Sequence, residues 1–501
     1  MSARGGSHLS SRDIAVIDVG SNSVRLVLYR VEGRAIWTAY NEKVLAGLGR
    51  GTARTGRLSP EGVTQAIAAL KRFRAVLDGA RPDEVFTAAT AAVREAVDGP
   101  AFVERVLRET GLEIRVLSGE DEAHFAALGV AAGAVDAHGV VGDLGGSSLE
   151  LTRLDHGRPG PGVTMALGPF SLGAPAPLDP VSVRAACTAA FARLGDRFHS
   201  ETFYAVGGAW RNLALVHMAV TDYPLQIVHQ FEMPAREALE TARFVARQSR
   251  GSLERIPGVS KKRVETMGYA AVVLESVIET LGVRTVSVSA YGVREGLLLE
   301  AMAPADRALD PLVEGCYWLG ARHGISERMG PPLEAWLKPL WSSLEPLFPA
   351  GRDNILLAAA CRLCDLGARL HPDHRADLAF DQVLRAPIAG QSHAERAFLA
   401  AAVFSRYTAQ NQTREGSGIA RLLSPDRLRR ARALGAALRL GCDLSGRSEV
   451  LLDQATLRLT GQGIELTVRR ERADMVLGEQ TRKRLAGLAD VLELPSLIDV
   501  R

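Results

Sequence analysis

The feature that most constrains the fold of this chain is an internal repeat. Residues 18–30, DVGSNSVRLVLYR, align without a gap on residues 143–155, DLGGSSLELTRLD, at an offset of 125 positions. In both copies an apolar run leads into Asp-x-Gly, then small hydroxylated residues, then a strand with alternating apolar positions. Each copy predicts a β-hairpin with a tight glycine-containing turn, and the two copies form an internal repeat.

The turns of the two hairpins expose backbone N–H groups, which suits them to an anion such as phosphate. Two such turns facing each other across a cleft would each contribute a nest of donors. A third glycine turn, in FYAVGGAWRNLA, follows a strand ending at Val206 and opens a helix at Gly207 and Gly208, whose N-terminus could also face an anion. A lone glycine turn is more often only a turn, but a registered repeat of Asp, Gly and Ser is hard to explain by turn chemistry alone.

Two stretches between the repeats carry side chains suited to phosphate chemistry. In TAATAAVREA, Thr90 begins a helix and Arg94 lies one turn further on, where a hydroxyl and a guanidinium could converge. The alternative is an ordinary threonine N-cap with a surface arginine. In LSGEDEAHFAALGV, Ser118 caps a helix that has three acids in its first turn. The helix dipole favours acids there, but three exceed what a cap needs, and one could act as a general base.

Composition excludes several classes of protein. The chain has 501 residues, 47% hydrophobic and 23% charged, with a net charge of +3, so an anionic partner must meet a local basic surface rather than a global charge. No apolar run approaches the ~18 residues of a membrane span. The five scattered cysteines, with no signal peptide, predict reduced thiols in a cytoplasmic protein. We expect no membrane and no nucleic-acid partner.

Six motifs in order resemble those of the exopolyphosphatase and guanosine pentaphosphate phosphohydrolase (Ppx/GppA) family, within the actin, Hsp70 and sugar-kinase superfold. They are IDVGSNSVRLVLY, TAATAAVREA, LSGEDEAHFAALGV, GDLGGSSLEL, AVGGAWRNLA and VSAYGVREGLL, which span about residues 12–305. The resemblance implies an α/β fold of two ribonuclease-H-like (actin-like ATPase) lobes with the active site between them. It also implies magnesium-dependent hydrolysis of the terminal phosphate of a long anionic chain.

The resemblance assigns roles to particular residues. It implies Glu122 as the catalytic base and Asp143 and Glu150 as ligands of Mg²⁺. At the offset of 125, Glu150 replaces Arg25, so one turn supplies an anion and the other a cation. The residues that it implies for phosphate binding are Ser21, Asn22, Ser23, Arg25, Thr90, Arg94, Gly145, Gly146, Ser147, Ser148, Gly207 and Gly208.

The pattern of the chain predicts five segments. They are a disordered tail (1–11), an N-terminal actin-like lobe (12–135), a second actin-like lobe (136–305), a helical domain (306–445) and a small C-terminal α+β domain (446–501). The helical domain resembles a His-Asp metal phosphohydrolase module, but Cys364-Asp365 stands where a His-Asp pair would be. We therefore expect no working metal site there, and we interpret Cys361 and Cys364 as buried small residues.

Three functions compete. The first is a processive exopolyphosphatase, the second a guanosine pentaphosphate 5′-phosphatase, and the third a nucleotide-binding kinase or chaperone of the same superfold. The bulky Trp210 and Arg211 after the third glycine turn disfavour a nucleotide. Basic clusters in the C-terminal half favour a track for inorganic polyphosphate, and a homodimer through that half would extend the track. These clusters are Arg427, Arg429, Arg430 and Arg432, then Arg469, Arg470 and Arg472, then Arg482, Lys483 and Arg484.

Overall fold

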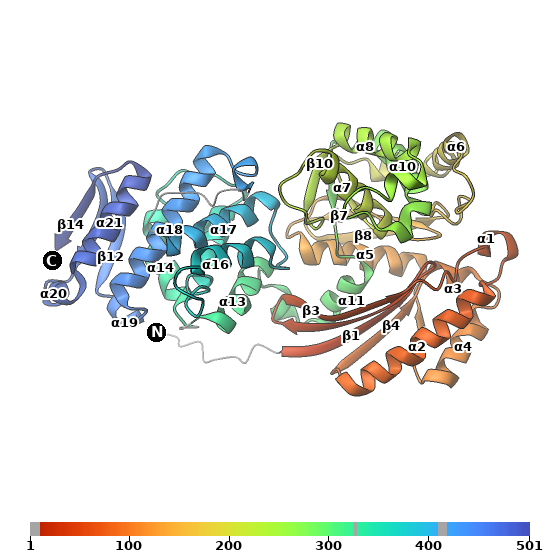
Figure 1. Cartoon of the computed structure of the whole chain (residues 1–501), viewed down its shortest axis with the longest axis horizontal. Coiled ribbons are helices and arrows are strands. Elements are labelled where there is room, and N and C mark those ends of the chain that lie inside the picture. Colours follow the sequence, from red (N-terminus) through yellow and green to blue (C-terminus); the bar gives the residue numbers. More distant parts are fainter. Residues whose placement is uncertain (1–10, 325–327, 409–417) are drawn as a thin grey trace. The chain divides into compact units, whose positions relative to one another are not determined.

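The computed structural model describes residues 11–324, 328–408 and 418–501 (Figure 1). The chain divides into two compact units, Met1–Ala308 and Leu309–Arg501. The predicted disordered tail, 1–11, lies outside the described residues apart from Ser11, which opens the first strand. After Met302 comes a short helix, α12 (Pro304–Arg307), whose Arg307 donates side-chain hydrogen bonds to the carbonyls of Met302 and Glu300. The finer division into lobes and domains stays a prediction.

The first sheet of the N-terminal unit has the strand order β3-β2-β1-β4-β5. β1 pairs antiparallel with β2 and parallel with β4. Apolar side chains from one face, including Ile17 and Leu26, pack against Leu70 and Phe73 of α2 and Phe102 of α4. The elements are β1 (Ser11–Val19), β2 (Val24–Glu32), β3 (Ala35–Val44), α1 (Thr52–Thr55), α2 (Pro60–Ala80), β4 (Glu84–Ala89), α3 (Ala91–Glu95), α4 (Gly99–Thr110) and β5 (Arg115–Val116).

The second sheet repeats this arrangement and adds an edge strand, in the order β10-β11-β9-β6-β7-β8. β6 pairs antiparallel with β7 and parallel with β9, and Phe203 and Trp210 lie in the apolar core beside the sheet. Its elements are β6 (Gly139–Leu144), β7 (Leu149–Asp155), β8 (Arg158–Met165), α6 (Pro180–Phe191), β9 (Thr202–Val206), α7 (Gly208–Val220), β10 (Phe231–Pro234), α8 (Ala235–Arg247), α9 (Arg250–Leu253), α10 (Val264–Leu281) and β11 (Thr285–Val288).

The two hairpins of the sequence repeat have the same turn. The N–H of Gly20 donates to the carbonyl of Ser23 at 3.0 Å, and 125 residues later the N–H of Gly145 donates to the carbonyl of Ser148, also at 3.0 Å. The strand registers match as well, since Asp18 faces Arg25 and Asp143 faces Glu150. The predicted fold of two ribonuclease-H-like lobes is therefore confirmed.

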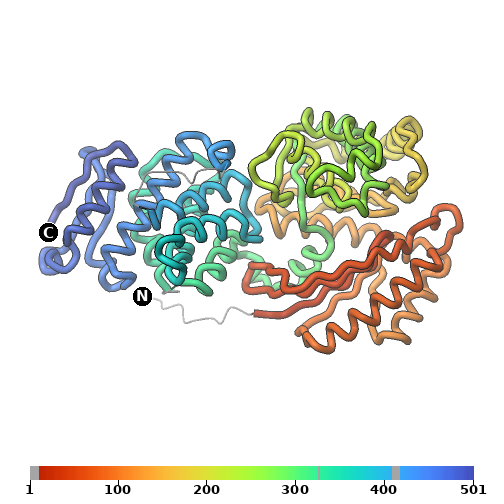
Figure 2. Tube along the Cα trace, viewed as in Figure 1, coloured from red at the N-terminus to blue at the C-terminus, as the bar shows by residue number. Residues whose placement is uncertain are grey.

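Two helices, α5 (Gly119–Gly133) and α11 (Val293–Ala301), connect the two sheets. α5 packs on β7 and β8 of the second sheet, whereas α11 packs on α5 and reaches β1 of the first. Figure 2 shows α11, in green, beside the N-terminal strands. Phe125 of α5 and Leu298 of α11 are buried in one core with Ile14 and Val16 of β1.

The C-terminal unit consists of packed helices followed by a three-stranded sheet, β12-β13-β14. In this sheet β12 pairs antiparallel with β13, and β14 joins parallel to β13. The indole N–H of Trp336 donates to the carbonyl of Ala455 at 2.8 Å and ties helices to sheet. The elements are α12 (Pro304–Arg307, at the end of the first unit), α13 (Pro311–His323), α14 (Gly330–Trp341), α15 (Arg352–Arg362), α16 (Arg375–Arg385), α17 (His393–Tyr407), α18 (Pro425–Ser445), α19 (Glu449–Leu452), β12 (Ala455–Thr460), β13 (Gly463–Val468), α20 (Ala473–Val476), α21 (Glu479–Leu492) and β14 (Ser496–Val500).

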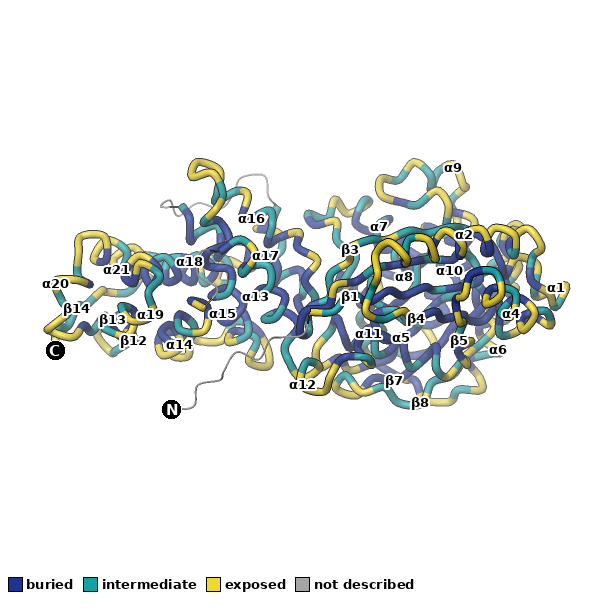
Figure 3. The backbone as a smooth tube through the Cα atoms, turned by 90° about the horizontal axis from the view of Figure 1, so that it is seen from below, coloured by how far each residue is buried: buried dark blue, intermediate teal, exposed yellow. Residues whose placement is uncertain are grey.

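Burial follows this layered arrangement. Figure 3 shows long buried stretches in the strands and exposed residues at outer elements such as α1, which buries none of its residues. The five cysteines are all described, buried and free of disulfides, as the sequence predicted. Within the described ranges, no helix has both the length and the apolar character needed to cross a membrane.

We expect the close contact between α5 and α11 to tolerate no side chain at Gly296. A Cβ there would lie 1.9 Å from the backbone oxygen of Phe125, so Gly296→Ala must push the helices apart and should destabilise the unit by about 1–3 kcal/mol. Gly79→Ala, in the exposed end of α2 with no atom within 4 Å, is the control and should be neutral or slightly stabilising. Thermal melts of both variants test this, and equal melting temperatures would contradict it.

Candidate functional site

A cleft in the N-terminal unit is lined by residues of both sheets. It encloses ≈ 1020 Å³, counting the space at its open mouth. Both glycine turns of the repeat contribute to the lining, and so does the third turn at the start of α7. The structure therefore brings eleven of the predicted site residues to one place: Ser21, Asn22, Ser23, Arg25, Thr90, Glu122, Asp143, Gly145, Gly146, Gly207 and Gly208.

The two repeated turns lie directly against each other. A Cβ placed on Gly146 would be 2.9 Å from the Cβ of Ser21, closer than real Cβ atoms approach. The backbones can meet this closely only because Gly146 has no side chain. The turns thus form opposite walls of a narrow cleft.

The remaining predicted residues, Arg94, Ser147, Ser148 and Glu150, do not line the cleft. The carbonyl of Ser147 accepts from the Oγ of Ser171 at 2.6 Å, and Ser148 closes the turn through its carbonyl. These two serines therefore stabilise the second turn through their backbone carbonyls and do not line the cleft. Arg94 and Glu150 act on residues of the cleft, as described below.

The three acids of the predicted helix start have different environments. Ser118 caps α5 and forms a reciprocal capping box with Asp121, while Glu120 is exposed. Glu122 is only 6% exposed and lines the cleft. Its Oε2 accepts from Nη1 of Arg94 at 3.0 Å. The cap explains Asp121 and solvent explains Glu120, so Glu122 is the acid that a cap does not account for.

The acids of the cleft are buried close enough to repel one another. Burial, followed by repulsion from Asp143 and Asp18, raises the pKa of Glu122 to about 7, although the hydrogen bond from Arg94 opposes this shift. Burial and the neighbouring Asp18 also raise the pKa of Asp143 to about 6. A carboxyl group whose pKa lies near neutral pH suits general base chemistry.

Glu150 lies fully buried beside these acids on β7. Its Oε1 accepts from the hydroxyl of Thr164 at 2.7 Å, but its Oε2 has no hydrogen-bond partner among the described residues. Burial and repulsion from Glu122 and Asp143 hold its pKa well above the usual range. A buried carboxylate with an unpaired oxygen is destabilised unless it is protonated or a cation binds beside it.

Thr90 stands at the N-cap position of α3, as the sequence predicted. Its hydroxyl makes no capping hydrogen bond, and the residue lines the cleft. The ordinary N-cap alternative is therefore not supported by the structure. Arg94 is no free surface arginine either, since its Nη1 donates both to Glu122 and to the carbonyl of Leu117 at 3.0 Å.

Sequence reasoning missed four cations that line the cleft with Arg25: Lys43, Arg211, Arg263 and Arg294. Arg211 and Arg294 lie inside two of the quoted motifs, so their charge was visible there. Lys43, at the end of β3, and Arg263, just before α10, come from segments without a recognisable pattern. Only the folded chain brings these to the glycine turns.

The surroundings of Arg263 and Arg294 explain how two of these arginines are placed at the cleft. A Cβ on Gly208 would lie 2.2 Å from the Cζ of Arg263, so the glycine lets that guanidinium lie across the start of α7. Glu295 pairs with Arg294 at 3.9 Å and also accepts hydrogen bonds from the hydroxyl of Tyr29 and the N–H of Gly292. The cation of Arg294 is thereby fixed at the cleft.

Crowding lowers the proton affinity of most of these cations, whereas Glu295 and the acids of the cleft raise the pKa of Arg294. Burial and the neighbouring arginines lower the pKa of Arg25 and of Arg211 to about 10, and that of Lys43 to about 7. Positive groups held this close together are stabilised by an anion. The cleft is therefore arranged for a multiply charged anion, with acids on one side.

Three arginines of the first predicted basic cluster make contacts within the C-terminal unit. The guanidinium of Arg427 donates to the carbonyl of Leu347 and stacks on Phe348, with 4.2 Å to the ring centroid. Arg430 lies over the ring of Trp341, and Arg429 pairs with Asp426 and Glu493. Arg427, Arg429 and Arg430 therefore have partners within the C-terminal unit, and a polyphosphate track over this cluster stays a prediction.

Comparison with known proteins identifies the family. The sequence profile of the Ppx/GppA phosphatase family matches residues 27–304, more than half of the chain. The chain belongs to the Ppx/GppA phosphatase family. A second profile, that of the exopolyphosphatase C-terminal region, matches residues 351–494. The matches extend over parts of both units, and the first contains most of the cleft.

Individual Ppx/GppA relatives are distant in sequence. Exopolyphosphatase 1 of Mycobacterium tuberculosis is 25% identical over 312 residues, which are 58% of this chain and 88% of that protein. Among solved structures, a family member from Aquifex aeolicus has 25% identity and a TM-score of 0.51, covering 59% of this chain and all of the other. An exopolyphosphatase from Cytophaga hutchinsonii, at 22% identity and a TM-score of 0.53, shares the fold over 57% of this chain and 96% of its own.

The lowered pKa of Lys43 predicts that the affinity of the cleft for anions depends on pH. Since its pKa is about 7, its charge is present below that pH and lost above it, so sulfate should bind several-fold less tightly at alkaline than at acidic pH. Lys43→Arg keeps its charge and should retain more of the affinity at alkaline pH. Acids of the cleft ionise in both proteins, so the difference between the two titrations isolates Lys43. Identical pH profiles would contradict the assignment.

Proposed function

We propose that this protein is an exopolyphosphatase that removes the terminal phosphate of inorganic polyphosphate, with Mg²⁺ and processively. Its family places it among phosphoanhydride hydrolases. The observation that carries the proposal is the buried carboxyl group of Glu122, with a pKa near neutral pH, in a cleft lined by five cations and three glycine turns. The relatives named above as exopolyphosphatases support this substrate.

In the proposed mechanism the cleft first binds the end of the phosphate chain. The exposed N–H groups of the two turns and the hydroxyls of Ser21, Ser23 and Thr90 would hold the terminal phosphate. Arg25, Arg211 and the other cations would neutralise the following phosphates. Because this charge is already in place before the substrate arrives, it stabilises the charge that develops on the leaving phosphate without reorganising.

Glu122 would then remove a proton from the attacking water. Its Oε2 is held by Arg94, which leaves Oε1 to accept the proton. Arg94 is thus a positioning residue, and its charge also keeps the carboxyl group from being protonated too readily. The water attacks the terminal phosphorus in line with the departing chain oxygen, which leaves on the shortened polyphosphate.

The acids of the cleft fit Mg²⁺. Hard carboxylate oxygens are its preferred ligands, and the unpaired Oε2 of Glu150 needs a cation. Asp143 and Glu150 would hold the ion, and bound Mg²⁺ would neutralise charge on the phosphate oxygens. Among the described residues, the cleft does not bring three metal-binding side chains within 4.8 Å of one another. The remaining ligands of the ion would therefore be phosphate oxygens and water.

The alternatives differ in substrate or class. A guanosine pentaphosphate 5′-phosphatase would use the same chemistry on a smaller molecule. A kinase or chaperone would place a nucleoside beside the third glycine turn, where Arg263 lies across Gly208 and Arg211 lines the cleft. This disfavours a nucleotide role. A homodimer and a cytoplasmic location stay predictions from the sequence.

Phosphate release from three substrates distinguishes the first two functions. We expect release from long-chain polyphosphate in the presence of Mg²⁺, loss of that release with excess chelator, and slower release from guanosine pentaphosphate. Chain-length analysis of the remaining polymer should show full-length and short chains together, because a processive enzyme finishes one chain before starting another. Faster release from guanosine pentaphosphate than from polyphosphate would overturn the proposal in favour of the second function.

Glu122→Gln tests the catalytic base. The amide keeps the shape and the contact with Arg94 but cannot take a proton, so kcat should fall by about 10²–10⁴-fold while substrate affinity is retained. Glu120→Gln, in the same helix turn but exposed, is the matched control and should be near normal. Near-normal turnover of Glu122→Gln, with loss in Glu120→Gln, would show that another acid is the base.

A further inference from the structure

We propose a second metal site, for a zinc-class ion, at the end of the β6–β7 hairpin opposite the cleft. Its ligands are the imidazoles of His138 and His156 and the carboxylate of Asp155. His138 immediately precedes β6, Asp155 ends β7, and His156 begins the turn into β8. Among the described residues these three form the one group whose metal-binding atoms all lie within 4.8 Å of one another.

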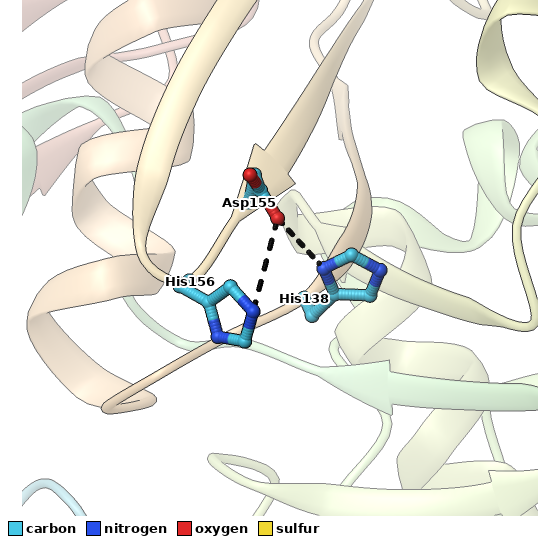
Figure 4. A group of neighbouring side chains, drawn as sticks. All are labelled: His138, Asp155 and His156. Carbon is cyan, nitrogen blue, oxygen red and sulfur yellow. Dashed lines mark hydrogen bonds and ion pairs between the residues drawn. The ribbon is translucent and has the colours of Figure 1, made fainter.

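The three donor atoms already converge (Figure 4). Nδ1 of His138 lies 3.1 Å and Nε2 of His156 lies 4.0 Å from the same Oδ1 of Asp155. Around a tetrahedral Zn²⁺ with bonds of about 2.0–2.1 Å, ligand atoms lie roughly 3.3 Å apart. Small rotations of the exposed side chains therefore suffice to admit the ion.

A second carboxylate orients one ligand. Nδ1 of His156 donates to Oδ1 of Asp136 at 2.6 Å, which directs the ring's Nε2 toward Asp155. A carboxylate behind a ligating histidine fixes its tautomer and increases its basicity, an arrangement common at zinc sites. The N–H of Gly157 also donates to the carbonyl of Ala137 at 2.8 Å, so the backbones that carry these residues are tied together.

The site is separate from the cleft and differs in chemistry. In the β6–β7 register, Gly139 faces Leu154 at this end, whereas Asp143 faces Glu150 at the other. Imidazole nitrogens are ligands suited to Zn²⁺, Ni²⁺ or Cu²⁺, whereas the carboxylate oxygens of the cleft are ligands suited to Mg²⁺. A bound ion would clamp the β7–β8 turn onto the segment before β6. The side chains of the three ligands are 57–73% exposed, so water can complete the coordination.

Titration of the full chain with Zn²⁺ in the presence of Mg²⁺ tests the site. We expect one saturable ion, at least tenfold weaker binding in His138→Ala and in His156→Ala, and about tenfold weaker binding in Asp136→Asn, since removing such an outer carboxylate typically costs 10–100-fold. Substitution with Co²⁺ should give the visible spectrum of tetrahedral nitrogen and oxygen ligation in the parent but not in His138→Ala or His156→Ala. Because the residues are exposed and outside the cleft, the variants should melt normally in chelator and keep basal phosphatase activity.

A matched histidine pair provides the control. His371 and His374 are also exposed, with ring centroids 5.6 Å apart against 5.5 Å for His138 and His156. Nδ1 of His371 lies 3.8 Å from Asp373, but among the described residues these side chains do not form a group of three converging donors. The double variant His371→Ala/His374→Ala should bind Zn²⁺ like the parent. Binding that is equal in the parent and in His138→Ala and His156→Ala, or no saturable binding in the parent, would show that these residues form only surface hydrogen bonds.

Discussion

The contact between α5 and α11 is the constraint on which the rest of the N-terminal unit depends. Backbone meets backbone where Gly296 lies against Phe125 and Gly129 against Gly292, so the helices approach more closely than side chains would allow. α5 starts at the cleft with Glu122, and α11 starts there with Arg294. Any separation of the helices would move the proposed base and one of the cations apart. The packing of small residues, rather than a covalent link, therefore sets the geometry of the chemistry.

Acidic and basic side chains are buried in the same cleft, and burial destabilises the charged forms of both. The pKa of Glu122 and Asp143 is raised by burial and mutual repulsion, while that of Arg25, Arg211 and Lys43 is lowered by burial and neighbouring cations. Neither set is fully relieved by the other. A phosphate chain would stabilise the charged cations, and a divalent ion would stabilise the charged acids, so both proposed ligands would favour the charged forms of these groups.

The two ends of the β6–β7 hairpin illustrate how one piece of structure serves two chemistries. At the cleft end, buried carboxylates lie beside the glycine turns that we propose bind phosphate; at the other, exposed imidazoles and a carboxylate converge. In the C-terminal unit, by contrast, conspicuous charges have a packing role. Arg427 stacks on Phe348, and Asp365, at the place of the absent His-Asp pair, is held by Arg447 at 2.6 Å.

The sequence by itself determined the duplicated hairpins, the helix starts and the family, because local turn chemistry and strand alternation recur at a fixed offset. The quoted motifs also contain most residues that line the cleft, since the motifs lie at the ends of strands and helices. Tertiary structure alone decided that Glu122 rather than its neighbours is buried, and that Lys43 and Arg263 join the cleft. The tertiary structure also placed His138 close to His156 and put Arg427 of α18 against Phe348. Those outcomes depend on contacts between distant segments, which periodicity along the chain does not encode.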